Sequence, residues 1–96
     1  GLHTHERAIE AGVRFSGCTI HFVRPEMDDG PIIAQAAVPI RQDDSPDTLA
    51  GRVLVEEHKI YPLAVKMIAE GRVSITGSRV IVSNAVNPDS TTINPA

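Results

Sequence analysis

One long amphipathic helix constrains this sequence more than any other feature. Ser45 suits a helix N-cap, because its side chain can accept a hydrogen bond from a free backbone N–H group. Pro46 fits the first helical position, and Asp47 places a negative charge at the positive end of the helix dipole. One apolar stripe at helical spacing follows, made of Leu49, Val53, Ile60, Ala64 and Met67. We therefore predict a helix that begins at Ser45 and ends at Gly71.

Two strands precede this helix and a hairpin follows it. Residues 18–23 (CTIHFV) are rich in β-branched and aromatic residues, and residues 32–40 (IIAQAAVPI) form a second strand-like run. The turn between them is too short for a parallel crossover, so we expect an antiparallel pair. Residues 72–76 and 79–83 are separated by Gly77-Ser78, which predicts a β-hairpin.

The remaining segments complete a mixed α/β order. Residues 4–11 predict a short helix that Thr4 can cap and Gly12 can end. Pro62 should kink the long helix or split it in two, because proline lacks an N–H group and clashes with the preceding turn. The order helix, two strands, long helix and β-hairpin is typical of part of an α/β sheet. Residues 84–96 are polar and contain proline, so we expect a loose C-terminal tail.

Composition excludes several classes of protein. The 96 residues make one domain at most, and 42% of them are apolar, as in ordinary globular proteins. No run reaches the roughly 20 apolar residues that span a bilayer, so we expect no membrane association. A net charge of −3 without a basic patch argues against nucleic acid as a partner. The single cysteine, Cys18, excludes an internal disulfide and a Cys-rich zinc site, and it fits a reducing cytoplasm.

His21 and Asp28 are the first candidates for chemistry, since a histidine in a strand is followed by a carboxylate in the next turn. In one interpretation Asp28 folds back, fixes an imidazole tautomer or raises the pKa of a nearby histidine, which can then donate a proton near neutral pH. In the other, Asp28-Asp29-Gly30 is a solvated turn and His21 is a half-exposed strand residue. Spacing alone favours the second interpretation.

Two further groups of polar residues allow similar alternatives. His3 and His5 form an H-x-H pair, but no third ligand lies at a spacing that suits a metal site, so loop or cap histidines are favoured. Glu56 and Glu57 lie on either side of the apolar stripe, where a carboxylate can meet an arginine or the hydroxyl groups of a ligand. For Glu56 we favour an i,i+4 ion pair with Arg52, whereas the role of Glu57 stays open.

Three segments together carry a family resemblance: GLHTHERAIEAG (1–12), SGCTIHFVRPEMDDGPIIAQAAVPI (16–40) and DSPDTLAGRVLVEEHKIYP (44–62). They resemble the C-terminal half of the phosphoribosylglycinamide formyltransferase family, and the resemblance covers roughly residues 1–75. It implies a Rossmann-like mixed sheet, of which residues 1–83 form the C-terminal half and residues 84–96 a polar tail. It also implies a cytoplasmic enzyme of purine synthesis that transfers a formyl group from 10-formyltetrahydrofolate to glycinamide ribonucleotide.

The resemblance assigns roles to individual positions. Asp28 matches the family's active-site aspartate, which raises the pKa of a catalytic histidine, and His21 matches the strand histidine beside it. The loop that holds the folate pterin matches Arg24, Pro25, Glu26, Met27 and Asp28, although many relatives have an acidic residue in place of Pro25. The helix turn that contacts the ribonucleotide matches Leu54, Val55, Glu56 and Glu57, with Glu57 on the ribose hydroxyls. No metal is implied.

An important part of the family pattern is absent from these residues. The phosphate-binding loop and the Asn-x-His-Pro motif, whose Asn and His stabilise the oxyanion and donate a proton, belong to the family's N-terminal half. We therefore expect a fragment that is inactive alone and whose main partner is that missing half; a homodimer is compatible with the resemblance. Two alternatives are another superfamily member, such as formyltetrahydrofolate deformylase, and an inactive fragment that acts only as a folding or complementation partner.

Overall fold

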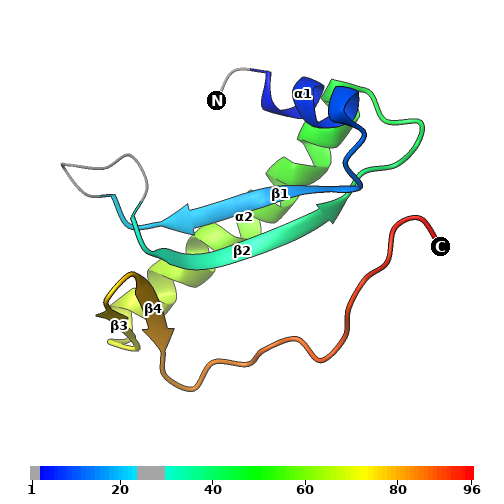
Figure 1. Ribbon diagram of the computed structural model, residues 1–96. Coiled ribbons are helices and arrows are strands. Elements are labelled where there is room, and N and C mark those ends of the chain that lie inside the picture. The colour runs from blue at the N-terminus through cyan, green and yellow to red at the C-terminus, as the bar shows by residue number, and fades with distance from the viewer. Residues whose placement is uncertain (1–2, 24–29) are drawn as a thin grey trace.

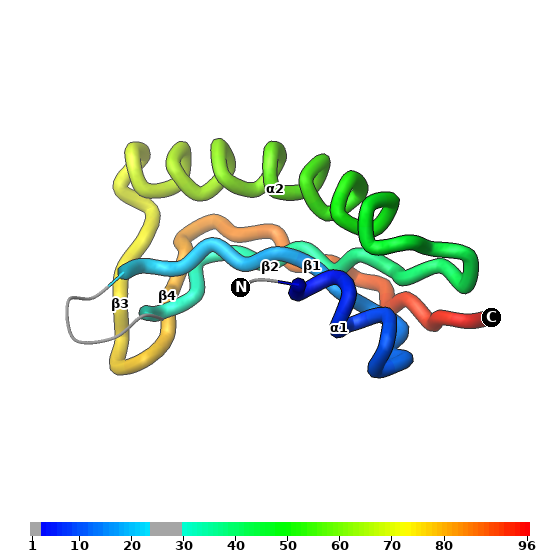
Figure 2. The backbone as a smooth tube through the Cα atoms, turned by 90° about the horizontal axis from the view of Figure 1, so that it is seen from above, coloured from blue at the N-terminus to red at the C-terminus, as the bar shows by residue number. Residues whose placement is uncertain are grey.

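The computed structural model describes residues 3–23 and 30–96, and the order of its elements confirms the predicted one. The six elements are α1 (Thr4–Ala11), β1 (Phe15–His21), β2 (Ile32–Pro39), α2 (Pro46–Ala69), β3 (Val73–Thr76) and β4 (Arg79–Val82). Helix α2 lies along one face of the β1–β2 pair, and the β3–β4 hairpin lies at the C-terminal end of α2 (Figures 1 and 2). Within the described residues, no helix is both long and apolar enough to cross a membrane.

Strands β1 and β2 form the antiparallel pair that the short turn predicts. Cys18 lies opposite Ala36 in the register, and the register shifts between Ile20 and His21. The strand begins at Phe15, three residues before the predicted start at Cys18. Gly17 is the reason that the chains can approach here, because a Cβ atom at this position would collide with the carbonyl oxygen of Ala36. The hairpin β3–β4 is also antiparallel, as predicted.

The apolar stripe of α2 forms most of the core, as the sequence predicts. Its five members are the buried residues of the helix, and Leu49 is completely buried against Val38, Ile40 and Val53. The capping box at Ser45 confirms the predicted start: the Ser45 hydroxyl accepts a hydrogen bond from the Thr48 N–H group, and Thr48 Oγ1 accepts one from Ser45 N.

The structure excludes one outcome predicted for Pro62 and corrects the predicted cap of α1. Of the two outcomes predicted for Pro62, a kink or a split, the split does not occur: α2 continues without interruption through Pro62, which is exposed. Helix α1 has His3 rather than Thr4 as its N-cap residue, and His3 makes no side-chain cap hydrogen bond. The predicted end is confirmed, since Gly12 adopts φ 73° and its N–H group donates to the Ile9 carbonyl.

An ion pair that sequence spacing did not predict ties the β2–α2 connection to α2. Arg52 Nη1 and Nη2 each lie 2.6 Å from one carboxylate oxygen of Asp44, a bidentate geometry. The Asp44 side chain is only 3% exposed. The predicted Arg52–Glu56 pair is therefore wrong, and Glu56 pairs instead with Lys59 at 3.3 Å. The hydrogen bond from Arg52 is the main reason that the pKa of Asp44 lies well below its usual range.

The C-terminal tail has no regular structure but is fixed near its end. The Asn94 side-chain amide donates hydrogen bonds to the carbonyl oxygens of Arg14 at 2.7 Å and Ile40 at 2.9 Å. These two residues flank the first pair of the β1–β2 ladder, and Ile40 N also donates to Arg14 O at 2.9 Å. The tail thus returns from the hairpin to the opposite end of the sheet (Figure 1).

We predict that Leu49→Ala destabilises the protein by about 2–5 kcal/mol, because it removes a completely buried side chain and leaves a cavity. Leu63→Ala, on the same helix but 48% exposed, is the matched control and should cost less than about 1 kcal/mol. Urea unfolding measures both values. Equal losses would contradict the assignment of the core to this face of α2.

We predict that Asp44→Asn lowers the urea midpoint at pH 7, with Asp43→Asn as an exposed control. The folded-state pKa of Asp44 is lowered, so its contribution is complete above the usual value of 3.8 and is lost progressively as pH falls below it. The difference between parent and variant should therefore shrink in acid. A difference that stays constant from pH 7 to pH 2 would contradict this assignment.

Candidate functional site

His21 lies at the end of β1, where it closes the base of the segment that connects β1 to β2. Its Nδ1 atom is 3.0 Å from the carbonyl oxygen of Phe22 and 3.4 Å from the backbone nitrogen of Gly30. Phe22 N also donates to Pro31 O at 2.9 Å. The half-buried imidazole therefore contacts the chain on both sides of residues 24–29.

The whole predicted folate loop, residues 24–28, lies outside the described residues. These residues are Arg24, Pro25, Glu26, Met27 and Asp28. Their assignments, including the contact of Asp28 with a histidine, stay predictions. What the structure does place is the base of this loop, which His21, Phe22, Gly30 and Pro31 hold together.

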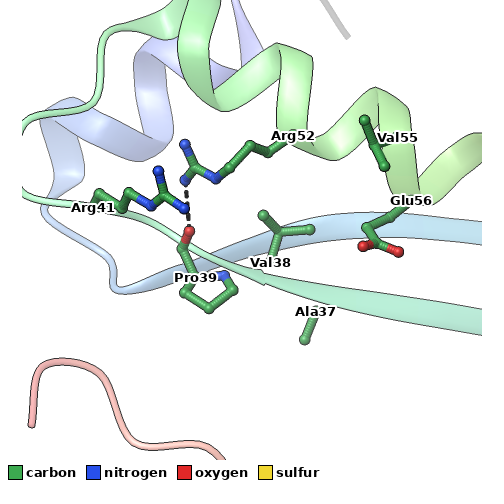
Figure 3. A pocket seen from close by; sticks show the side chains of 7 residues that line it. All are labelled: Ala37, Val38, Pro39, Arg41, Arg52, Val55 and Glu56. Carbon is green, nitrogen blue, oxygen red and sulfur yellow. Dashed lines mark hydrogen bonds between the residues drawn. The ribbon is translucent and has the colours of Figure 1, made fainter.

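Glu56 and Glu57 lie on opposite flanks of α2. Glu56 lines a pocket of about 320 Å³ on the β2 side, together with Arg41 and Arg52 (Figure 3). Glu57 lines two pockets on the other flank, one of about 500 Å³ beside β1 and one of about 520 Å³ beside α1. Of the two carboxylates, Glu57 alone thus lines the pockets that β1 and α1 border.

The pocket beside β1 is mostly apolar. It is lined by Cys18, Thr19, Ile20, Glu57, His58, Tyr61 and Pro62. In the described part of the chain, β1 pairs only with β2, so its other edge has no partner strand. The flank of α2 above this edge carries large apolar side chains that are 44–63% exposed: Leu54, Tyr61, Val65 and Ile68. The site is therefore bordered by an uncovered apolar surface.

Cys18 lines this pocket, and the groups around its thiol do not activate it. Burial raises the pKa of its thiol, and the negative charge of Glu57 raises it further. A raised pKa leaves less of the reactive thiolate, so the geometry agrees with the interpretation of Cys18 as a small strand hydrophobe.

The histidines of GLHTH contribute to the pocket beside α1. His3 Nδ1 pairs with Glu6 Oε2 at 3.0 Å, and His3, His5 and Glu57 line the same pocket. His5 Nδ1 is shielded from solvent and has no hydrogen-bond partner among the described residues. Within residues 3–23 and 30–96, no three His, Cys, Asp or Glu side chains are grouped so that they could hold a metal ion.

A family model, a curated relative and a solved structure all match this chain to formyltransferases. A family model described as formyl transferase matches residues 1–65. Phosphoribosylglycinamide formyltransferase of Escherichia coli is 47% identical over 75 residues, which are 78% of this chain and 35% of that protein. The crystal structure of glycinamide ribonucleotide transformylase 1 from Symbiobacterium toebii has a TM-score of 0.79 and 50% identity, covering 85% of this chain and 39% of that one.

A formyltetrahydrofolate deformylase from Pseudomonas syringae also matches, with a TM-score of 0.79 but only 28% identity, over 85% of this chain and 28% of that one. The matched part of this chain thus covers 28–39% of the length of these three relatives.

We predict that the His21 imidazole carries its proton on Nδ1, because the shorter contact is to a carbonyl oxygen, which can only accept. Nitrogen-15 NMR of the imidazole ring distinguishes the two neutral tautomers. A proton on Nε2 would show that Nδ1 instead accepts from Gly30 N–H and would contradict this geometry.

Proposed function

This chain belongs to the formyl transferase family, and on that premise we propose that it forms the C-terminal part of a glycinamide ribonucleotide formyltransferase. The enzyme would transfer a formyl group from 10-formyltetrahydrofolate to the ribonucleotide amine, a cytoplasmic step of de novo purine synthesis. The observation that carries this proposal is the 47% identity to the Escherichia coli enzyme over 75 residues.

Sequence identity supports the transferase over the deformylase, whereas the fold does not separate them. The TM-score is 0.79 to both the Symbiobacterium transformylase and the Pseudomonas deformylase, but the identities are 50% and 28%. The difference favours transfer to an amine over hydrolysis.

The proposed reaction is direct acyl transfer. The amine attacks the formyl carbon and a tetrahedral oxyanion forms, which hydrogen-bond donors must stabilise. Its collapse breaks the bond between that carbon and the folate nitrogen, which takes up a proton as tetrahydrofolate leaves, while the attacking amine loses one. We assign to Asp28 the role of raising the pKa of a catalytic histidine in the N-terminal half, and to residues 24–28 the binding of the pterin. Residues 54–57 would contact the ribonucleotide, with the Glu57 carboxylate accepting hydrogen bonds from ribose hydroxyls. The position of Glu57 at the pockets beside β1 and α1 supports this last assignment.

The missing N-terminal half is the proposed partner of the uncovered surface. An unpaired strand edge and exposed apolar side chains favour association. We propose that this half adds a strand to the free edge of β1 and covers the apolar flank of α2, and so closes the Glu57 pockets. It would also supply the oxyanion donors. A second copy of this chain is the alternative occupant.

We predict that the 96 residues alone have no formyltransferase activity and that adding the separately expressed N-terminal half restores it. In the restored enzyme Asp28→Asn should lower kcat by ~10²-fold or more, in line with the usual contribution of acid–base groups. Asp29→Asn, the neighbouring carboxylate, is the control and should retain activity.

The assay follows both formylated ribonucleotide and free formate. Formate release without ribonucleotide formylation would identify a deformylase instead. Full activity of Asp28→Asn would overturn the role given to Asp28, and failure of the two halves to associate would overturn the proposed partner surface.

A further inference from the structure

Arg52 and Asp44 lie at the centre of a polar network that joins three parts of the chain. Besides the bidentate pair, Arg52 Nη2 donates to the carbonyl oxygen of Pro39 at 2.8 Å (Figure 3). Asp44 accepts from the backbone nitrogen of Arg41 at 2.7 Å and from Thr48 Oγ1 at 2.8 Å. The end of β2, the connection that follows it and the first two turns of α2 are therefore fixed to one another.

The buried stripe sets which face of α2 meets the sheet along the whole helix, because Ile60, Ala64 and Met67 are buried as well. Among the described residue pairs of β1 and β2, only the Ala36–Cys18 pair offers two small side chains to α2, since Ala36 shares the inner face of the sheet with buried Val38 and lies opposite Cys18. Small side chains offer few ridges to interlock with a helix. Glu56 and Glu57 are ~100° apart around the helix axis, so even a small rotation that keeps the stripe buried moves Glu57 relative to the β1 side.

We propose that Arg52 and Asp44 are positioning residues that fix the rotation of α2 and thereby direct Glu57 to the ribonucleotide. This inference rests on the proposed function, in which Glu57 contacts the ribose. Arg52 is suited to the task because it lies five residues before Glu57 and on the β2 side of the helix, where Glu56 lines the same pocket. A bidentate guanidinium–carboxylate pair is directional, whereas a lysine at this position would keep the charge but lose the fixed geometry.

The test uses the full-length enzyme with Arg52→Lys, Arg52→Gln and Asp44→Asn. We expect the KM for the ribonucleotide to rise roughly tenfold in Arg52→Gln and Asp44→Asn and less in Arg52→Lys, as for lost positioning of one substrate. The KM for the folate cosubstrate should stay within about twofold, because the folate loop is attached to β1 and β2 rather than to α2. Glu70→Gln, which breaks the Glu70–Arg72 pair at the other end of α2, is the matched control and should change neither value.

The outcomes separate this inference from the proposed function. If Glu57→Gln raises the ribonucleotide KM but the Arg52 and Asp44 variants do not, the positioning role is wrong and the proposed function stands. If Glu57→Gln leaves that KM unchanged, the ribose assignment fails, and the positioning role fails with it. Equal rises in both KM values, or a loss of stability alone, would show that the Arg52–Asp44 pair has only a structural role. Should Arg52→Gln fail to fold, Arg52→Lys and Asp44→Asn carry the same comparison.

Discussion

The contact between one face of α2 and one face of the β1–β2 pair holds the whole structure together. Leu49 and Val53 of the helix meet Val38 and Ile40 of the sheet side, and this cluster is the main core. Helix α1 packs against the same cluster through Ala8 and Ile9. Because the core is small, directional polar contacts have a large share in fixing where the helix lies.

The polar contacts are concentrated at one end of this layer. The capping box at Ser45, the Asp44–Arg52 pair and the Asn94 amide all lie near the β2–α2 connection. The other end of the β1–β2 pair carries His21 and the base of the predicted folate loop. The structure thus fixes the start of α2 strongly and leaves both the free edge of β1 and one flank of α2 open to a partner.

Spacing along the sequence predicted the features that depend only on residues within one helix. The Ser45 cap and the apolar stripe depend on spacing within one helix, and both are confirmed. The Asp44–Arg52 pair could not be found in this way, because its partners lie outside the usual i,i+4 spacing and meet only when the N-cap turns the chain. Gly17 was not predicted as a strand residue either. A glycine is needed there only because the carbonyl oxygen of Ala36 on the neighbouring strand comes close, which sequence spacing does not show.

The role of the residues around His21 could not be predicted from spacing. Spacing alone favoured a solvated turn after His21, and only the family resemblance indicated a ligand loop. His21 is the last residue of β1 and is half-buried, as the second interpretation expects, and its contacts with Phe22 and Gly30 place it at the base of the loop. The contact of Asp28 with a histidine stays a prediction. Chemistry that depends on groups from another part of a protein cannot be read from the spacing of these residues alone.

The most direct test of the account is a crystal structure of the full-length enzyme with both the ribonucleotide and a folate analogue bound. We expect ribose hydroxyls within hydrogen-bond distance of the Glu57 carboxylate, the pterin against the backbone of residues 24–28, and a strand of the N-terminal half paired with the free edge of β1. A ribonucleotide bound on the Glu56 flank, or a β1 edge without a partner strand, would contradict it.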